Sequence, residues 1–187
     1  MTHQLNFIYN DSDWICPSEY PDLSQAKEIA IDLETKDPNI KTKGAGWATF
    51  DGAIVGFAVA ALGQQWYFPI QHDAGGNMDL AITTAWMQDV LKTPATKIFH
   101  NASYDVGWLL INGFEIRGKI VDTMIAAALI NENRFSFSLN ACAKDYLGEI
   151  KNETFLTEKA KEWGIDAKGD LWRLPAGYVG FYAEQDA

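Results

Sequence analysis

The amino-acid sequence predicts an α/β domain in which helices flank a mixed central sheet. Three observations predict this class. Residues 28–34 alternate apolar and polar side chains with the period of a half-buried strand. Two further strand-like segments, residues 53–62 and 65–70, follow closely enough to form an antiparallel meander with it. After them, short apolar strands alternate with helical patterns, as they do where helical crossovers join parallel strands.

The first half of the chain is expected to supply the antiparallel part of the sheet. Residues 1–25 are predicted to form a short strand followed by turns, and residues 35–52 a polar loop that contains glycine. The hairpin that follows has Gly63-Gln64 between its strands, a typical turn length. The two faces of the first main strand differ: Ile29, Ile31 and Leu33 lie on one, and Ala30, Asp32 and Glu34 on the other.

The second half alternates helices with short strands. Residues 96–99 and 115–121 are predicted strands, of which the second has the weaker pattern. Six helices are predicted from apolar periodicity and from their boundary residues. They cover residues 77–92 with Asn77 as the N-cap, 102–112 before Gly113, 123–130 after Asp122, 138–147 between Ser138 and Gly148, 153–163, and a last helix that starts at Pro175.

Composition and charge restrict the function. The chain has 187 residues, of which 48% are hydrophobic, enough for a single domain over residues 1–187 with a substantial core. We find no signal peptide and no run of about 18 apolar residues, and we expect a monomeric, cytoplasmic protein without a membrane partner. The formal net charge of −10 argues against broad binding to duplex DNA, but clustered carboxylates suit divalent cations. Cys16 and Cys142 lack metal-type spacing and are interpreted as reduced core thiols.

Asp32-Leu-Glu34 places two carboxylates on one face of a strand, because residues i and i+2 point the same way. Two adjacent anions repel each other unless a cation lies between them, so the pair is a candidate metal site. The alternative is a pair of solvated acids at a strand end. The DxE pattern alone does not distinguish the two interpretations.

Two further acidic residues lie one helical turn after a polar residue. Asn101 and Asp105 are four apart on a predicted helix, and so are Tyr182 and Asp186. Taken singly, each pair is better explained structurally, the first by a helix cap and a favourable charge in the first turn, the second by an amphipathic helix with an acidic end. The combination favours a metal site. Four carboxylates and a phenol suit two Mg²⁺ or Mn²⁺ ions about 3.5–4 Å apart.

The order DxE, NxxxD and YxxxD resembles the three motifs of the DnaQ-like exonuclease superfamily, in its tyrosine-containing DEDDy branch. The motifs are Asp32-Leu-Glu34, Asn101-Ala-Ser-Tyr-Asp105 and Tyr182-Ala-Glu-Gln-Asp186. The segments that begin at Asp122, Asn133 and Ala143 are similar to the proofreading domain of family A DNA polymerases, phage-type members in particular. Over residues 28–187 the resemblance implies an RNase H-like fold and 3′-to-5′ release of nucleoside monophosphates from single-stranded DNA. The sister branch has histidine where this chain has Phe181, so it does not fit.

The resemblance also implies a role for each acidic residue. Asp32 would bridge two metal ions. Glu34 and Asp186 would hold the ion that activates water, and Asp105 would hold the other ion, partly through water. Tyr182 would orient the attacking water, so that no side chain acts as the nucleophile.

Substrate contacts follow from the same resemblance. Asn101 and Tyr104 are expected beside the terminal nucleotide, where an amide and an aromatic ring contact it. Arg134 is expected at a backbone phosphate and Phe155 stacked on a base. A surface charge and a core aromatic are the alternatives for these last two. His100 is interpreted as a hydrogen-bonded structural residue.

Two alternative functions stay open at this point. An RNA exonuclease resembling ribonuclease D shares all three motifs, and an inactive exonuclease-like domain would only bind nucleic acid. The intact carboxylates argue against the second. The chain ends at Ala187, directly after Asp186, whereas family members continue. We therefore expect a domain truncated at its C-terminus, a weakly held Asp186, and a polymerase domain as a candidate for the remainder of a longer protein.

Overall fold

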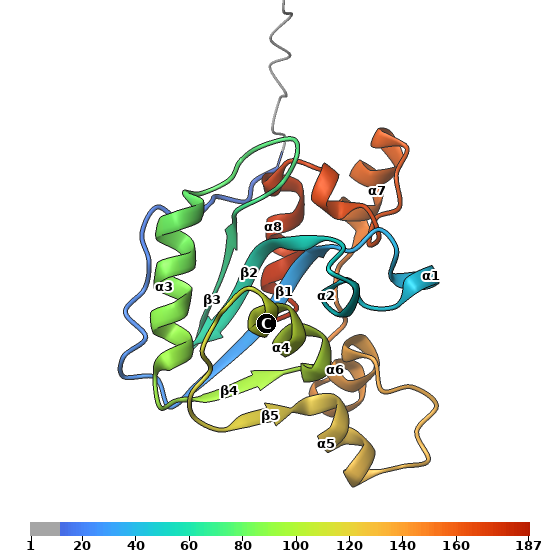
Figure 1. The fold of residues 1–187 in the computed structure, drawn as a ribbon. Helices are drawn as coiled ribbons and strands as arrows, with labels where there is room; N and C mark the ends of the chain where they lie inside the picture. The colour runs from blue at the N-terminus through green and yellow to red at the C-terminus, as the bar shows by residue number, and fades with distance from the viewer. Residues whose placement is uncertain (1–11) are drawn as a thin grey trace, which may run out of the picture.

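In the computed structural model, which describes residues 12–187, five strands form one mixed sheet in the order β3-β2-β1-β4-β5 (Figure 1). The first three strands pair antiparallel, and β4 and β5 add in parallel on the other side of β1. This confirms the predicted mixed sheet. The strands are β1 (Glu28–Lys36), β2 (Ala53–Ala61), β3 (Gln64–Pro69), β4 (Thr96–Phe99) and β5 (Ile120–Asp122).

Eight α-helices and a short 3₁₀ helix surround the sheet in the described part of the chain. None of these helices has the length and apolarity that crossing a bilayer requires. They are α1 (Ile40–Lys43), α2 (Gly46–Thr49), α3 (Leu80–Lys92), α4 (Ala102–Ile111), α5 (Thr123–Ile130), α6 (Leu139–Leu147), α7 (Thr154–Trp163), η1 (Leu171–Arg173) and α8 (Ala176–Glu184).

The alternation of β1 divides the core into two layers. Its apolar face packs in the larger cluster, together with Met87 and Leu91 of α3 and Trp108 of α4. On the opposite face of the sheet, Ala58 and Tyr67 pack against α7 and α8. The register pairs Asp32 with Ala58 and Ala58 with Tyr67, so the acidic face of β1 is turned toward α8.

The start of α3 differs from the prediction. Asp79, not Asn77, is the N-cap, and its carboxylate accepts the N–H of Ile82 at 2.9 Å. Asn77 instead exchanges two hydrogen bonds with the backbone of His72, at 2.8 and 2.9 Å. Both residue types cap helices well, and here the amide of Asn77 is engaged by the backbone of His72, five residues earlier.

Four other segments differ in detail from the prediction. The hairpin turn is Leu62-Gly63, one residue earlier than predicted, and both residues have positive φ (55° and 75°), as a two-residue I′ turn requires. The segment predicted as a polar loop contains α1 and α2. Within residues 115–121 the strand is shorter than predicted, because β5 starts at Ile120. The short strand expected in residues 1–25 is absent from residues 12–25, and residues 1–11 lie outside the described part.

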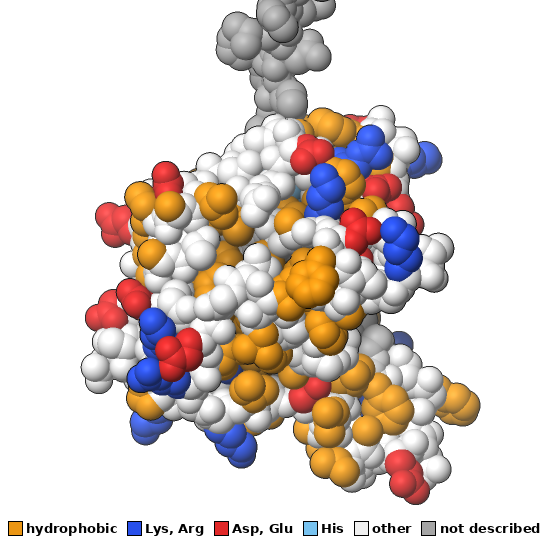
Figure 2. All heavy atoms as spheres, viewed as in Figure 1, with side chains coloured by type: hydrophobic (Ala, Val, Ile, Leu, Met, Phe, Trp, Pro, Cys, Tyr) orange, Lys and Arg blue, Asp and Glu red, His pale blue; other side chains and the backbone are white. Residues whose placement is uncertain are grey.

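The outer face of α5 is strongly apolar. Ile125, Leu129 and Ile130 are 56%, 84% and 72% exposed, and Figure 2 shows hydrophobic side chains gathered where α5 lies, at the lower right. A contiguous exposed apolar face is typical of a surface that contacts another domain or chain.

Candidate active site

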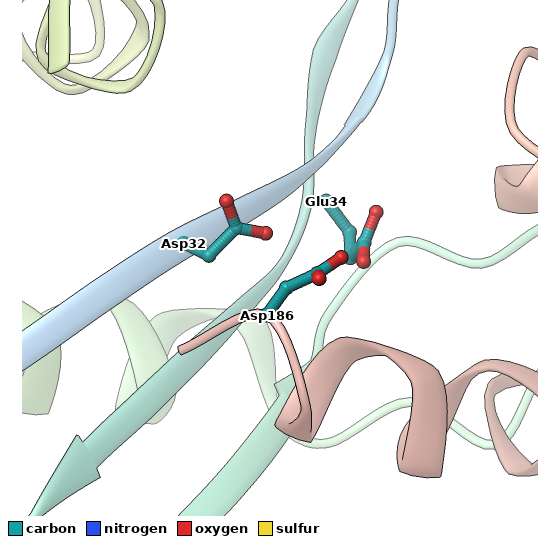
Figure 3. Close-up of side chains that lie close together, drawn as sticks. All are labelled: Asp32, Glu34 and Asp186. Carbon is teal, nitrogen blue, oxygen red and sulfur yellow. The ribbon is translucent and has the colours of Figure 1, made fainter. Parts of the chain in front are cut away.

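Three carboxylates meet at the C-terminal end of β1. Asp32 and Glu34 project from one face of the strand, and Asp186 reaches them from the segment after α8 (Figure 3). Each offers an oxygen, and these oxygens all lie within 4.8 Å of one another. The pairing between β1 and β2 shifts register directly after Glu34, and such bulges commonly redirect side chains next to active sites.

Asp105 lies beside this group and is held by the backbone of β1. Pairing between β1 and β4 ends at Ala30 and Ile98, so the N–H of Leu33 has no ladder partner on that side. The Oδ1 of Asp105 accepts this N–H at 3.2 Å, and the side chain is buried in the first turn of α4. Asp105 therefore sits where the two parallel strands separate.

Asp122 fixes the helix that carries Asp105. Its carboxylate accepts the N–H groups of Asn101 and Ala102 at the start of α4, at 3.2 and 2.8 Å. It also accepts those of Met124 and Ile125 in the first turn of α5, at 2.9 and 3.3 Å. The predicted cap of one helix is thus confirmed and serves two helix N-termini.

The last helix, α8, is held against the sheet by contacts of Glu184 and Gly180. The Glu184 carboxylate accepts hydrogen bonds from the indole N–H of Trp14 at 2.9 Å and from the N–H of Tyr67 at 3.3 Å. A Cβ at Gly180 would collide with the Trp14 ring, so glycine allows this close approach. These contacts hold α8 against the sheet and place Tyr182 and Asp186 at the site.

A cavity of about 210 Å³ opens beside Asp32 and Asp186, and Tyr182 is also part of its lining. Four residues of its lining belong to no predicted motif: Asn140, Lys151, Glu153 and Lys168. Lys151 and Glu153 lie in the loop between α6 and α7, which has no periodicity to indicate where a side chain points. The lining residues are Asp32, His100, Ser138, Leu139, Asn140, Lys151, Glu153, Lys168, Tyr182 and Asp186.

Burial and mutual repulsion raise the pKa values of the acidic group. Burial is the largest cause for Asp32, whose pKa lies well above its usual value, and for Glu34, whose pKa rises to about 8. Burial also raises the pKa of Asp105 to about 7 and that of Asp186 in the same direction. The Lys151 ammonium lowers the pKa values of Asp32, Glu34 and Asp186, but it does not cancel the effect of burial.

These residues fit divalent cations. Carboxylate oxygens are the preferred ligands of Mg²⁺ and Mn²⁺. Glu34 Oε1 is buried and has no hydrogen-bond partner among the described residues, and a buried polar atom of this kind requires a partner. A divalent cation bound between Asp32 and Glu34 would neutralise the charge of both carboxylates.

The raised pKa values predict a stability that falls as pH rises. From about pH 5 to about 7 the folded state keeps protons on both Glu34 and Asp105, and from there to about pH 8 mainly on Glu34, whereas the unfolded chain has lost them. Unfolding should therefore become easier by up to about 1.4 kcal/mol per pH unit for each such carboxyl group. His72, whose pKa burial lowers from 6.5 to about 4, is neutral in both states above about pH 7.5, so the part of the slope due to Glu34 is free of its opposite contribution there.

Urea unfolding in chelator at four pH values measures this slope. Glu34→Gln should make it shallower, and saturating Mn²⁺ should reverse it, because ions bind the ionised carboxylates. An E34Q slope equal to that of the unchanged protein would contradict the assignment of the raised pKa to Glu34.

Two residues expected at the terminal nucleotide lie outside the cavity lining. Asn101 has a left-handed backbone (φ 68°), and its side-chain oxygen accepts the hydroxyl of Ser103 at 3.1 Å. The Tyr104 hydroxyl donates to Asp37 at 3.0 Å and lies 2.8 Å from the hydroxyl of Thr35. Both side chains are thus engaged with neighbouring residues next to the site.

The other expected substrate contacts have packing partners. The Arg134 guanidinium pairs with Asp145 at 2.9 Å and lies 4.8 Å from the centre of the Tyr146 ring, with 8% of its side chain exposed. The Phe155 ring packs edge-on against Tyr178 at 5.7 Å. In this structure the Arg134 guanidinium is thus largely buried in an ion pair, and the Phe155 ring is held by a packing contact.

His100, which directly precedes the motif that starts at Asn101, lines the cavity. Its Nε2 lies 2.9 Å from the Phe137 carbonyl and its Nδ1 lies 2.8 Å from Thr123 Oγ1. This confirms a hydrogen-bonded structural histidine. With both nitrogens engaged, it is not placed to serve as a general base.

The mixed sheet and the acidic site together define a DnaQ-like exonuclease domain. The model of a family described as 3′-5′ exonuclease matches residues 20–187, and the chain belongs to this family of metal-dependent enzymes. It is similar to a DNA-directed DNA polymerase of Pseudomonas phage M6, with 36% identity over 188 residues. The match covers 96% of this chain and 28% of the polymerase, so the chain spans less than a third of that relative's length.

Solved structures share the fold at low sequence identity. Trypanosoma brucei RNase D matches with a TM-score of 0.62 and 20% identity, covering 87% of this chain and 55% of that one. Brucella melitensis NrnC with bound Mg²⁺ matches with a TM-score of 0.57 and 19% identity, covering 89% and 69%. These likenesses confirm the RNase H-like fold that the sequence predicts.

Proposed function

We propose that this 3′-5′ exonuclease removes nucleoside monophosphates from the 3′ end of single-stranded DNA with two Mg²⁺ or Mn²⁺ ions. The observation that carries the proposal is the acidic group: three carboxylates share a space of 4.8 Å and Asp105 is fixed beside them. Asp32 is the candidate shared ligand. Glu34 and Asp186 are assigned to one ion and Asp105 to the other.

When bound, such ions lower the pKa of water and neutralise charge on the phosphate and on the leaving 3′ oxygen. The chain itself supplies the anionic frame and the orientation. Burial and the nearby carboxylates raise the pKa of Tyr182, so its phenol stays protonated. A neutral phenol beside Asp32 and Asp186 can orient water by hydrogen bonding without removing its proton.

DNA is favoured as the substrate because the relative with 36% identity is a DNA-directed DNA polymerase. RNA is the second candidate, because RNase D shares the fold. With matched 5′-labelled single strands and Mn²⁺, we expect kcat/KM for DNA to exceed that for RNA by about tenfold, equivalent to roughly 1.4 kcal/mol. Faster RNA hydrolysis would select the RNase D-like alternative, and binding of both strands without any cleavage would select the inactive binding module.

We also propose that residues 1–187 form one domain that works next to a polymerase domain in a longer protein. Relatives in which the match covers 26–28% of the length support this, since all are DNA polymerases. The exposed apolar face of α5 supports it as well, because a neighbouring domain would remove that face from water.

A further inference from the structure

Lys151 brings a buried positive charge into the acidic site. It lies in the loop between α6 and α7, and its ammonium forms an ion pair with Asp186. The same ammonium lies 3.4 Å from the centre of the Tyr182 ring. Only 7% of its side chain is exposed, and a lysine is buried to this extent only where its charge is compensated.

This ammonium contacts the carboxylate of Asp186, which is also a proposed ligand of a metal ion. Lys151 lines the same cavity as Asp32 and Asp186, and its charge lowers the pKa values of Asp32, Glu34 and Asp186. A divalent ion at Asp186 would need the carboxylate that Lys151 now contacts. Two cations at one carboxylate repel each other, so the lysine has to move when an ion binds.

The loop allows such a movement. Lys151 is outside any helix or strand, and the neighbouring Asn152 attaches the loop to the end of α8 through a hydrogen bond from its N–H to Gln185 at 3.0 Å. A four-carbon stem can therefore swing while its backbone stays in place. Lysine also binds phosphate as a mobile point charge with three donors.

We propose that Lys151 binds the phosphate of the terminal nucleotide after an ion has displaced its ammonium from Asp186. The inference rests on the proposed function, in which Asp186 is an ion ligand. The displaced ammonium stays in a cavity that also contains Asp32 and Tyr182, where the substrate phosphate is the remaining unpaired anion. Ion binding and substrate binding are thereby coupled through one side chain.

The other lysine of the cavity is placed differently. Lys168 pairs with Glu153 at 2.9 Å, and 59% of its side chain is exposed. It therefore has no need to leave the site when an ion binds. Lys151 is the lysine of this cavity that is both buried and paired with a candidate ion ligand.

Isothermal titration calorimetry of the 187-residue chain tests the proposal. The probes are Mn²⁺ alone and then deoxythymidine monophosphate at saturating Mn²⁺, since a product cannot be cleaved. Lys151→Gln and Lys151→Met should bind Mn²⁺ about threefold or more tightly, because the competing cation is gone. Both should bind the nucleotide about tenfold more weakly, since a charge-assisted hydrogen bond is lost.

Lys161→Gln is the matched control, because it removes the same charge from an exposed position of α7. Its two affinities should equal those of the unchanged protein, and Lys151→Arg should retain nucleotide binding. Near-UV circular dichroism verifies the fold of each variant, and the methionine variant remains informative if the glutamine variant unfolds. Unchanged or weaker Mn²⁺ binding by the folded Lys151 variants, or unchanged nucleotide binding, overturns the inference. If the unchanged protein binds no Mn²⁺, the proposed function itself fails instead.

Discussion

Replacing Asp32 and Glu34 together with alanine is expected to lower Mn²⁺-dependent hydrolysis of a single-stranded 3′ end by about a thousandfold or more. The double change removes two of the three clustered carboxylates, including the proposed shared ligand. Asp186 and Asp105 alone would hold an ion loosely. The measurement is the rate of nucleotide release from a 5′-labelled oligonucleotide under single-turnover conditions.

The fold should survive this change. Both side chains are acids whose burial disfavours their charged form, so their loss should leave the free energy of unfolding at pH 8 unchanged or higher. Glu28→Ala is the matched control, since it removes an exposed acid from the same strand and should retain full activity. Persistent Mn²⁺-dependent release by the folded double variant would place the reaction at another site.

Asp122→Ala is expected to lower the free energy of unfolding by about 2–4 kcal/mol, because it removes the caps of two helices at once. Four backbone N–H groups, those of residues 101, 102, 124 and 125, lose their acceptor. Activity should also fall, since α4 carries Asp105. Urea unfolding at pH 7 measures the first effect and the hydrolysis assay the second.

Asp79→Ala provides the comparison for this prediction. Asp79 caps only α3 and accepts one N–H, so its loss should cost about 1 kcal/mol without an effect on hydrolysis. Equal destabilisation by the two variants would show that Asp122 does not join α4 to α5. Asp122→Asn keeps one acceptor oxygen and should lie between them.

The strand β1 and the direction of its two carboxylates can be predicted from the sequence alone. Alternation over residues 28–34 predicts both the buried face of Ile29 and Ile31 and the opposite face of Asp32 and Glu34, and the structure agrees. Local rules succeed here because side-chain direction in a strand depends only on residue parity.

Other parts of the site depend on contacts between distant segments. Asp105 is placed by the separation of β1 from β4, which leaves the N–H of Leu33 free. Asp122 caps a helix that lies earlier in the chain, and Lys151 sits in a loop without periodicity. The contacts of these three side chains can be identified only once the fold is known.

The start of α3 shows the same limit on a smaller scale. Asn77 and Asp79 are both competent N-caps, so a local rule does not choose between them. The choice is made by His72, whose backbone takes both hydrogen-bonding groups of the Asn77 amide. That histidine is in turn fixed to the Leu174 carbonyl, just before α8, at 3.0 Å.

The clustered carboxylates come from β1 and from the segment after α8, so nearly all of the chain separates them. A ribosome releases Asp32 and Glu34 early and Asp186 only after α8 has been made. Because domains gain their tertiary contacts as the chain emerges, a nascent chain that ends before α8 has two of the three clustered carboxylates. The acidic group is therefore complete only after α8 and the segment that follows it have been synthesised.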